Sequence, residues 1–264
     1  MYQFGFIGMG NMGSAMLKGC LSVFPASTLA FSRKDAVKGK ALSLETGAVW
    51  IDSNRACAEQ SRYIILAVKP QFYDGVLKEI QPVLDDSRII ISLAPSYTIA
   101  DLKQALGASV RIVRAMPNTP AMVGEGMTGL SWSDDDFSES ERTELMQFFT
   151  SFGKAETVPE NLMDAVTAAS GSSPAFIYMM IEALADGVVK YGMPRDKAYT
   201  FVSQAVLGSA KMVLETGEHP GLLKDKVCSP GGTTIAAVAE LEASGFRSSL
   251  IKAASAVCDR CRNM

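Results

Sequence analysis

Short runs of apolar residues recur through the first 158 positions of the chain, and segments with helix-like spacing separate most of them. The runs are QFGFIG (3–8), LAFSR (29–33), AVWI (48–51), YIILAV (63–68), RIIISLA (88–94) and RIVRAM (111–116). Because they are apolar throughout instead of alternating with polar residues, they are typical of strands covered on both faces of a parallel sheet. The alternation of strand and helix predicts a doubly wound α/β domain over residues 1–158.

Two later segments of this first domain predict edge strands. They are GMTGLSW (126–132) and GKAETV (153–158), and an acidic helical segment lies between them. The polar residues 133–136 are predicted to cap the start of that helix.

After about residue 159 the strand-like runs stop and long helical patterns follow. They cover residues 161–170, 174–191, 195–216, 220–226, 232–243 and 246–262, with turn signals between most of them. The stretch 174–214 carries more apolar surface than one small helical domain normally hides, and such surface often marks an interface. We therefore predict an all-helical second domain, residues 159–264, that forms a homodimer; a self-contained helical bundle is the alternative.

Composition excludes several classes of protein. The net charge of −3 leaves no basic surplus for nucleic acid, and no apolar stretch is long enough to span a membrane. No signal peptide is visible, and five scattered cysteines fit a reducing cytoplasm. Cys258 and Cys261 form one C-x-x-C, but with His219 as the only histidine we predict no metal site.

The first apolar run leads into a glycine pattern of the form G-x-G-x-x-G. Gly8 permits a tight turn, Gly10 lets a pyrophosphate approach the backbone, and Gly13 lets the next helix pack close to the strand. The N-terminus of that helix supplies N–H groups and positive potential for phosphates. The predicted cofactor contacts here are Ile7, Gly8, Met9, Gly10, Asn11, Met12 and Gly13. A strand–turn–helix without a ligand is the alternative.

The second apolar run bears on which dinucleotide binds. It ends in Ser32, Arg33 and Lys34, where an NAD site would carry an acidic residue for the ribose hydroxyls. A hydroxyl and two cations suit a 2′-phosphate, so NADP(H) is the preferred cofactor and NAD(H) the alternative. A solvated Arg–Lys pair is the non-functional interpretation. Further predicted cofactor contacts are Asn54, Ala67, Val68, Lys69, Pro70, Ala94 and Asn118.

Three segments give the most specific signal: RAMPNTPAMVGEG (114–126), ASGSSPAFIY (169–178) and DKVCSPGGTTIAAV (225–238). Together with FIGMGNMG and AVKP they resemble the Δ1-pyrroline-5-carboxylate reductase family along essentially the whole chain. The resemblance implies an N-terminal Rossmann domain and a C-terminal helical dimerisation domain, with dimers that assemble further to decamers in some members. It also implies reduction of L-1-pyrroline-5-carboxylate to L-proline with NAD(P)H, the last step of proline synthesis.

The substrate of that reaction is a small cyclic imine that carries a carboxylate. In CSPGGTTI, a Pro-Gly-Gly turn precedes a helix that starts near Thr233, so backbone N–H groups there form a nest for the carboxylate. The predicted substrate contacts are Ser172, Ser173, Gly231, Gly232, Thr233 and Thr234. By resemblance, Thr234 lies nearest the ring nitrogen and is the predicted catalytic residue. An ordinary turn with a threonine N-cap is the alternative.

Other residues are weaker candidates. Ser172 and Ser173 are predicted to cap a helix that begins at Pro174, and Tyr178 is predicted to belong to the core. His219 is predicted to lie in an inter-helix turn, and Lys69 to bind cofactor rather than transfer a proton.

Two other functions stay open at this point. A β-hydroxyacid dehydrogenase would need a lysine soon after the glycine-containing turn 169–174, and the nearest is Lys190. An NADP-binding sensor would keep the phosphate loop without a carboxylate nest, and the intact SPGGTT argues against it.

Overall fold

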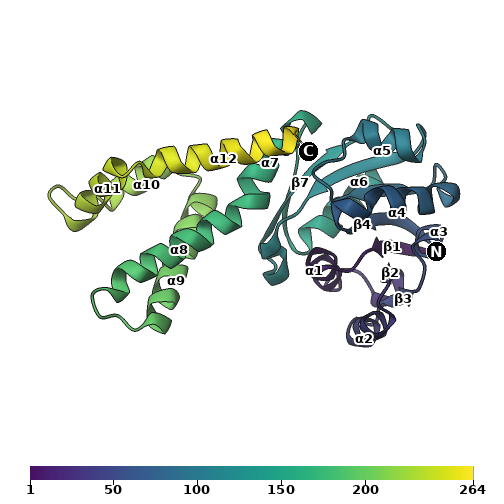
Figure 1. Ribbon diagram of the computed structural model, residues 1–264, viewed down its shortest axis with the longest axis horizontal. Coiled ribbons are helices and arrows are strands. Elements are labelled where there is room, and N and C mark those ends of the chain that lie inside the picture. Colours follow the sequence, from purple (N-terminus) through teal and green to yellow (C-terminus); the bar gives the residue numbers. More distant parts are fainter. Residues whose placement is uncertain (264) are drawn as a thin grey trace. The chain divides into compact units, whose positions relative to one another are not determined.

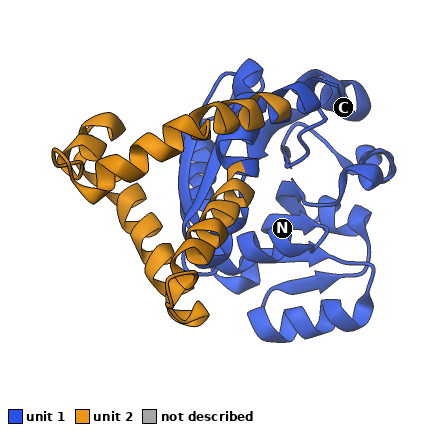
Figure 2. Ribbon diagram, turned by 60° about the vertical axis from the view of Figure 1, so that its left-hand side comes forward, with its two compact units in different colours: residues 1–172, 257–264 blue, residues 173–256 orange. Residues whose placement is uncertain are grey.

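The computed structural model describes residues 1–263, which fall into two compact units (Figures 1 and 2). Unit 1 comprises residues 1–172 and the end of the chain from Val257, and unit 2 comprises Ser173–Ala256. Figure 2 shows unit 1 in blue and unit 2 in orange. Unit 1 therefore holds both ends of the described chain.

Unit 1 is built on one sheet, and its strands lie in the segments where the sequence predicts them. The segment 126–132 is not the edge strand that was predicted, because it pairs with a strand on each side and only 153–157 lies at that edge. Within the described residues the sheet has eight strands in the order β3-β2-β1-β4-β5-β6-β7-β8. Strands β1 to β6 pair in parallel, β7 pairs antiparallel to β6, and β8 pairs parallel to β7. The strands are Tyr2–Ile7, Leu29–Ser32, Val49–Ile51, Ser61–Leu66, Ile89–Ser92, Arg111–Met116, Gly126–Trp132 and Gly153–Thr157. The order 3-2-1-4-5-6 is that of a doubly wound dinucleotide-binding fold, so the predicted fold class is confirmed.

Two apolar clusters cover the two faces of this sheet. On one face Phe4 stacks on Phe148 of α6, with ring centroids 4.3 Å apart, and α1 packs in the same cluster. On the other face Ile64 and Ile90 pack with residues of α4 and α5. The helices of unit 1 are α1 (Asn11–Cys20), α2 (Ala36–Thr46), α3 (Asn54–Glu59), α4 (Tyr73–Ile80), α5 (Ile99–Leu106), α6 (Glu139–Thr150) and α7 (Met163–Val166). Burial on both faces explains why the strands read as continuous apolar runs.

The start of α6 lies later than predicted. Its N-cap is Ser138, whose Oγ accepts from the N–H of Glu141 while the Glu141 carboxylate accepts from the N–H of Ser138. This reciprocal capping box fixes the first turn. The prediction of a cap within residues 133–136 was wrong, because Ser133 Oγ accepts from the N–H of Ile112 and Asp135 bonds Lys103.

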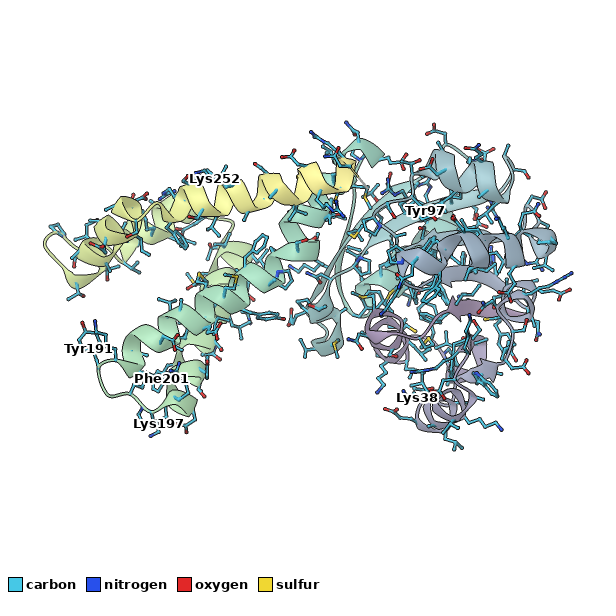
Figure 3. All side chains as sticks on the ribbon, in the orientation of Figure 1. Lys38, Tyr97, Tyr191, Lys197, Phe201 and Lys252 are labelled. Atoms are coloured by element: carbon cyan, nitrogen blue, oxygen red, sulfur yellow. The ribbon has the colours of Figure 1, made fainter. Side chains whose placement is uncertain are left out.

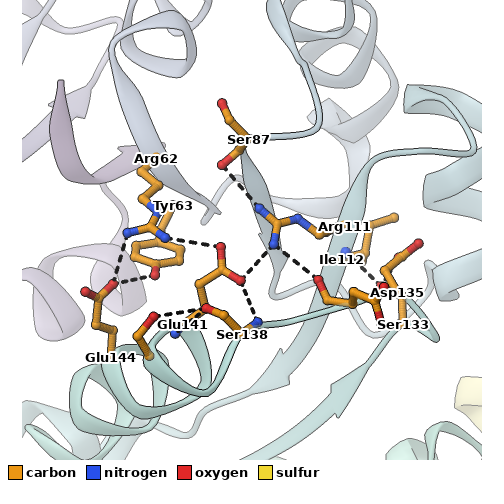
Figure 4. Close-up of polar contacts among 12 residues, drawn as sticks. Arg62, Tyr63, Ser87, Arg111, Ile112, Ser133, Asp135, Ser138, Glu141 and Glu144 are labelled. Atoms are coloured by element: carbon orange, nitrogen blue, oxygen red, sulfur yellow. Dashed lines mark hydrogen bonds and ion pairs between the residues drawn. The ribbon is translucent and has the colours of Figure 1, made fainter.

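The same Glu141 connects α6 to the amino ends of β4 and β6 (Figure 4). Its carboxylate lies 2.8 Å from the guanidinium of Arg111 and 3.2 Å from that of Arg62. Burial raises the pKa of Glu141, but the hydrogen bonds from Ser138 and Arg111 outweigh that effect and hold the pKa below its ordinary value. The carboxylate is therefore charged at neutral pH and ties α6 to the sheet.

Unit 2 is entirely helical, as predicted from residues 174 onwards. Its helices are α8 (Ser173–Val189), α9 (Arg195–Thr216), α10 (Pro220–Lys226), α11 (Thr233–Ala243) and α12 (Phe246–Arg262), the last of which continues into unit 1. Among residues 173–256, all of which the structure describes, Ala185 and Ala198 alone are buried. Tyr191 and Phe201, which lie at the α8–α9 hairpin in Figure 3, are largely exposed. Tyr178 is 59% exposed, so its predicted core position was wrong.

The junction between the two units is one continuous helical run. Helix α7 passes through a π-helical turn at Thr167–Ser172 directly into α8, so α8 does not begin at a capped Pro174 and the predicted serine cap was wrong. A proline has no N–H for the carbonyl four residues earlier. Here Nδ2 of Asn118 donates to that carbonyl, on Ser170, at 3.0 Å. The side-chain amide thus replaces the missing backbone bond.

The compact units divide later than the predicted domain boundary between residues 158 and 159. The segment that follows β8 stays with unit 1 because Met163 is buried there and Glu160 pairs with Arg114 of β6 at 2.8 Å. The functional boundary itself stays a prediction. None of the helices in the described part of the chain combines the length and apolar character that crossing a membrane requires.

Candidate active site

The glycine loop after β1 has the geometry that each glycine was expected to supply. Gly8 adopts a φ of +91°, and a Cβ there would lie 2.5 Å from Val68 Cγ1 at the end of β4. A Cβ on Gly13 would lie 2.6 Å from the carbonyl oxygen of Gly8, so α1 packs against the loop at van der Waals contact. A Cβ on Gly10 would have no heavy atom within 4 Å, so a ligand can approach the backbone at this glycine.

The N-terminus of α1 has the features of an anion-binding helix start. Gly10 is the N-cap and contributes no side-chain bond to the first turn, which contains no acidic residue in this described helix. The first N–H groups of α1 therefore lack a side-chain cap, and a hollow of about 520 Å³ lies beside this helix start, with Gly10 and Asn11 in its lining. That hollow is lined by Met9, Gly10, Asn11, Ser14, Ala15, Lys18, Gly19, Arg33, Ala121, Met122 and Gly124.

A second cavity, of about 400 Å³, lies at the carboxyl ends of β1, β2 and β4. It brings together predicted cofactor residues from four places in the sequence: Gly8, Ser32, Arg33, Lys34, Asn54 and Val68. Phe72, Gly75, Val76 and Glu79 complete the lining, and Arg33 lines both hollows. Lys34 Nζ lies 5.8 Å from the centre of the Phe72 ring, a cation–π contact that holds the ammonium at this rim.

Glu79 is a cavity residue that sequence reasoning missed. One of its carboxylate oxygens accepts from Asn54 Nδ2 at 2.8 Å and the other from the N–H of Arg55 at 3.3 Å. Asn54 Oδ1 in turn accepts from the hydroxyl of Ser32 at 2.7 Å. The signal that existed was the helical spacing of Val76 and Glu79, which places both on one face of α4.

Tyr73 was also missed, and it joins the ends of β4 and β5. Its hydroxyl donates to the carbonyl of Leu66 at 2.8 Å and accepts from the N–H of Leu93 at 3.1 Å. Burial raises the pKa of Tyr73 to about 12, so the phenol stays protonated and keeps donating. The hydrogen bond from the N–H of Leu93 to Tyr73 fixes the residue just before Ala94, a predicted cofactor residue that is buried.

The other predicted cofactor residues near β4 and β6 differ in their surroundings. Ala67 donates its N–H to the carbonyl of Ile7 at 2.8 Å, whereas Lys69 and Pro70 are exposed at the start of a 3₁₀ turn. Asn118 is only 8% exposed. Its Oδ1 accepts from the N–H of Met127 at 2.9 Å, and its amide nitrogen is used by the π-helical turn. The side chain of Asn118 is therefore a brace, and its predicted contact with cofactor stays a prediction.

In unit 2 the segment predicted to hold the carboxylate is a glycine turn followed by a helix start, and the nest itself stays a prediction. Gly231 adopts a φ of +67°, and Gly232 donates its N–H to the carbonyl of Ser229 at 3.0 Å, which closes a β-turn with Pro230 at its second position. Gly232 then serves as N-cap of α11 without a side-chain bond, and the first turn of this described helix has no acidic residue. Thr233 and Thr234 are the first helical residues and are exposed. The threonine N-cap alternative was therefore wrong.

His219 has a structural partner. It is the N-cap of α10, and its Nδ1 accepts from the N–H of Gly221 at 3.1 Å. This places it at the predicted inter-helix turn. Cys258 and Cys261 both lie on α12, where the thiol of Cys258 donates to the carbonyl of Asp164 at 3.7 Å.

Comparison with known proteins assigns both halves of the chain. Residues 160–264 match the family model for pyrroline-5-carboxylate reductase dimerisation, and residues 3–96 match that for NADP oxidoreductase, coenzyme F420-dependent. A pyrroline-5-carboxylate reductase of Escherichia coli K12 is 45% identical over 254 residues, which cover 95% of this chain and 94% of that protein. The chain belongs to the pyrroline-5-carboxylate reductase family. The open choice between this family and the hydroxyacid dehydrogenases is settled by that match.

Solved structures of pyrroline-5-carboxylate reductases have the same fold. The enzyme of Coxiella burnetii superposes with a TM-score of 0.91 at 31% identity, covering 99% of this chain and 98% of that one. The pyrroline carboxylate reductase of Plasmodium falciparum, solved with NADP bound, superposes with a TM-score of 0.88 at 31% identity, covering 99% of this chain and 97% of that one. The chain is thus an oxidoreductase of the NAD(P)-binding kind, with the dimerisation region that its family shares.

Proposed function

We propose that this chain reduces L-1-pyrroline-5-carboxylate to L-proline, the last step of proline biosynthesis, with NADPH as the preferred reductant and NADH as the alternative. The observation that carries the proposal is a pair of helix N-termini whose first N–H groups are not capped by a side chain. The starts of α1 and α11 are each preceded by a glycine N-cap, without a side-chain cap or an acid in the first turn of these described helices. One suits the pyrophosphate of a dinucleotide and the other the carboxylate of the imine.

The cavity residues fit the cofactor that the family implies. The open face of Gly10 admits a pyrophosphate to the N–H groups of α1, while Arg33 and Lys34 line the cavity next to it and supply positive charge for a 2′-phosphate. When bound, the cofactor supplies the hydride. The remaining predicted contacts, at the carboxyl ends of β4, β5 and β6, orient the nicotinamide half.

The chain's own chemistry at the imine is binding and charge stabilisation. The free N–H groups of Thr233 and Thr234 hold the carboxylate, whereas the N–H of Gly232 closes the turn on Ser229 and Gly231 gives the turn its shape. The hydroxyl of Thr234, directly or through a water molecule, hydrogen-bonds the ring nitrogen and steadies its charge. A strong protein acid is unnecessary because an imine is basic enough to arrive protonated. Ser172 and Ser173 line the same substrate pocket in this proposal.

The assembly and location complete the proposal. We place the cofactor domain at residues 1–158 and the dimerisation and substrate-binding domain at residues 159–264, with the homodimer as the basic unit and a decamer as a higher assembly. The match of residues 160–264 to the dimerisation model supports the dimer. The cytoplasm is the proposed location, supported by five free cysteines.

The experiment that tests the proposal follows oxidation of NADPH and NADH by absorbance, with pyrroline-5-carboxylate as substrate and proline as the assayed product. Thr234→Ala is expected to lower kcat/KM about 10- to 100-fold, because it removes a hydrogen bond to a charged group. Thr234→Ser should restore most of the loss. Thr200→Ala is the matched control, because that hydroxyl only bonds the carbonyl of Asp196 within α9.

Each result has a clear meaning. Wild-type protein that binds NADPH but oxidises none with this substrate would contradict the assigned reaction. If Thr234→Ala keeps the wild-type turnover from pH 6 to about pH 9, the range in which general acids usually titrate, the catalytic role of Thr234 is contradicted and the assigned reaction is not.

A further inference from the structure

The cavity that receives the adenosine end of the dinucleotide holds cations and a carboxylate together. Arg33 and Lys34 line it from the end of β2, and Glu79 lines it from α4. The two cations favour a 2′-phosphate, whereas a carboxylate in the same cavity repels one. Preference between the two dinucleotides is therefore set by a balance that includes a residue 45 positions after Lys34 in the sequence.

The hydrogen bonds of Glu79 also determine how Asn54 and Ser32 are oriented, and therefore which of their atoms donate. A charged carboxylate only accepts, so it must face the NH₂ group of Asn54, and Asn54 must then turn its oxygen toward Ser32. The hydroxyl hydrogen of Ser32 is used in that bond, which is 2.7 Å long. Ser32 Oγ is left with lone pairs for a ligand.

A ligand hydroxyl can bind the lone pairs of Ser32 Oγ, whereas a ligand phosphate is repelled by them. The 2′-hydroxyl of NADH can donate to Ser32 Oγ, whereas a 2′-phosphate at neutral pH can mainly accept hydrogen bonds. The orientation imposed by Glu79 thus favours the hydroxyl, in addition to the direct repulsion between its charge and the phosphate.

We infer that Glu79 is a specificity-determining residue that lowers the preference for NADPH over NADH. It places a negative charge in the cavity that Arg33 and Lys34 line, and it orients the hydroxyl of Ser32 through Asn54. The inference rests on the cofactor site of the proposed function. It refines the role of Ser32, which accepts from a ribose hydroxyl, and leaves recognition of the phosphate to Arg33 and Lys34.

The test measures equilibrium binding of NADP⁺ and NAD⁺ to the full-length protein by calorimetry, without substrate. Glu79→Gln keeps the size and the acceptor for Arg55 but removes the charge and the fixed direction of the chain. The ratio of the dissociation constants, NAD⁺ over NADP⁺, is expected to rise about five- to tenfold. Asp74→Asn is the matched control, because its carboxylate lies on the same helix but bonds the Tyr97 hydroxyl at 2.6 Å and does not line the cavity. It should leave the ratio within about twofold.

Ser32→Ala gives an independent arm. If Ser32 accepts from the ribose, this variant weakens NAD⁺ about fivefold and NADP⁺ less, as expected for one lost neutral hydrogen bond. A larger loss for NADP⁺ would overturn the inference, as would a ratio that moves equally in Glu79→Gln and Asp74→Asn. Wild-type protein that binds neither nucleotide would overturn the proposed cofactor site and this inference with it. Binding of both nucleotides with an unmoved ratio would overturn the inference alone.

Discussion

Glu141 is a single carboxylate on which two strands and a helix depend. It accepts from Arg62 of β4, from Arg111 of β6 and from the N–H of Ser138 at the start of α6. Its side chain is nearly fully buried, so a loss of its charge leaves Arg111 without its buried partner. Removing one member of a buried pair costs more than the pair itself contributes.

Glu141→Gln is therefore expected to lower the free energy of unfolding by about 2 kcal/mol at pH 7. The native pKa of Glu141 is lowered, so the stabilisation is present above the unfolded value of about 4.3 and is lost as pH falls through the native pKa. Urea denaturation at fixed protein concentration should show the difference in unfolding free energy between wild type and variant shrinking as the pH falls below about 4.3.

The control for this prediction is Glu139→Gln, which removes an exposed charge from the same first turn of α6. It should cost less than about 0.5 kcal/mol. A gap for Glu141→Gln that stays constant across the pH range would contradict the ion-pair explanation.

Single residues divide into those that local sequence reveals and those that it hides. Gly8, Gly10 and Gly13 were predictable because a few consecutive residues determine the turn they form. Glu79 and Tyr73 were not, since their partners lie 25 and 7 positions away in the chain and meet them only when α4 packs against α3 and the end of β4. Pairing across distant segments leaves no local pattern.

At the scale of elements, the positions of the strands could be predicted from short local segments, most of them continuous apolar runs. The ends of the helices could not, because they depend on side-chain partners. The predicted cap at residues 133–136 and the actual cap at Ser138 are both polar, and only the reciprocal bond with Glu141 selects the second. Pro174 likewise suggests a helix start, yet the π-helical turn at Thr167–Ser172 joins α7 to α8 without a break before the proline. The continuation depends on Asn118, a residue on a different loop.

Asn118→Ala is expected to lower the free energy of unfolding by about 2–3 kcal/mol. It leaves the N–H of Met127 and the carbonyl of Ser170 without the partner they now share, in a place that water reaches poorly. Ser170→Ala is the matched control, since it keeps the carbonyl and removes only a hydroxyl that bonds Val166 within the turn. Equal losses of stability in the two variants, measured by urea denaturation, would disprove the brace.

At the scale of the whole molecule, unit 2 lacks a core of its own. Residues 173–256 bury only two alanines, and their apolar side chains are spread over exposed helix faces. Burial of apolar surface is the main term that offsets conformational entropy, so such a unit needs a partner surface. This was predictable from the apolar excess of residues 174–214, whereas the number of copies that assemble was not, because composition carries no symmetry.

Leu184 tests the idea that the missing core comes from a second copy of the chain. It is 49% exposed and lines an apolar groove of about 460 Å³ between α8 and α9, together with Met180, Val188, Val202, Ala205, Val206 and Ser209. Leu184→Glu places a charge in that groove, where burial against a partner is costly without compensation. Light scattering after size exclusion is expected to show a smaller species than wild type, and the melting temperature should fall and depend more steeply on protein concentration. Leu44→Glu makes the same change at an exposed leucine on α2 of unit 1 and should alter neither quantity. If Leu184→Glu kept the wild-type mass at every concentration, the groove would lie outside the interface and the dimer would have to use another face of unit 2.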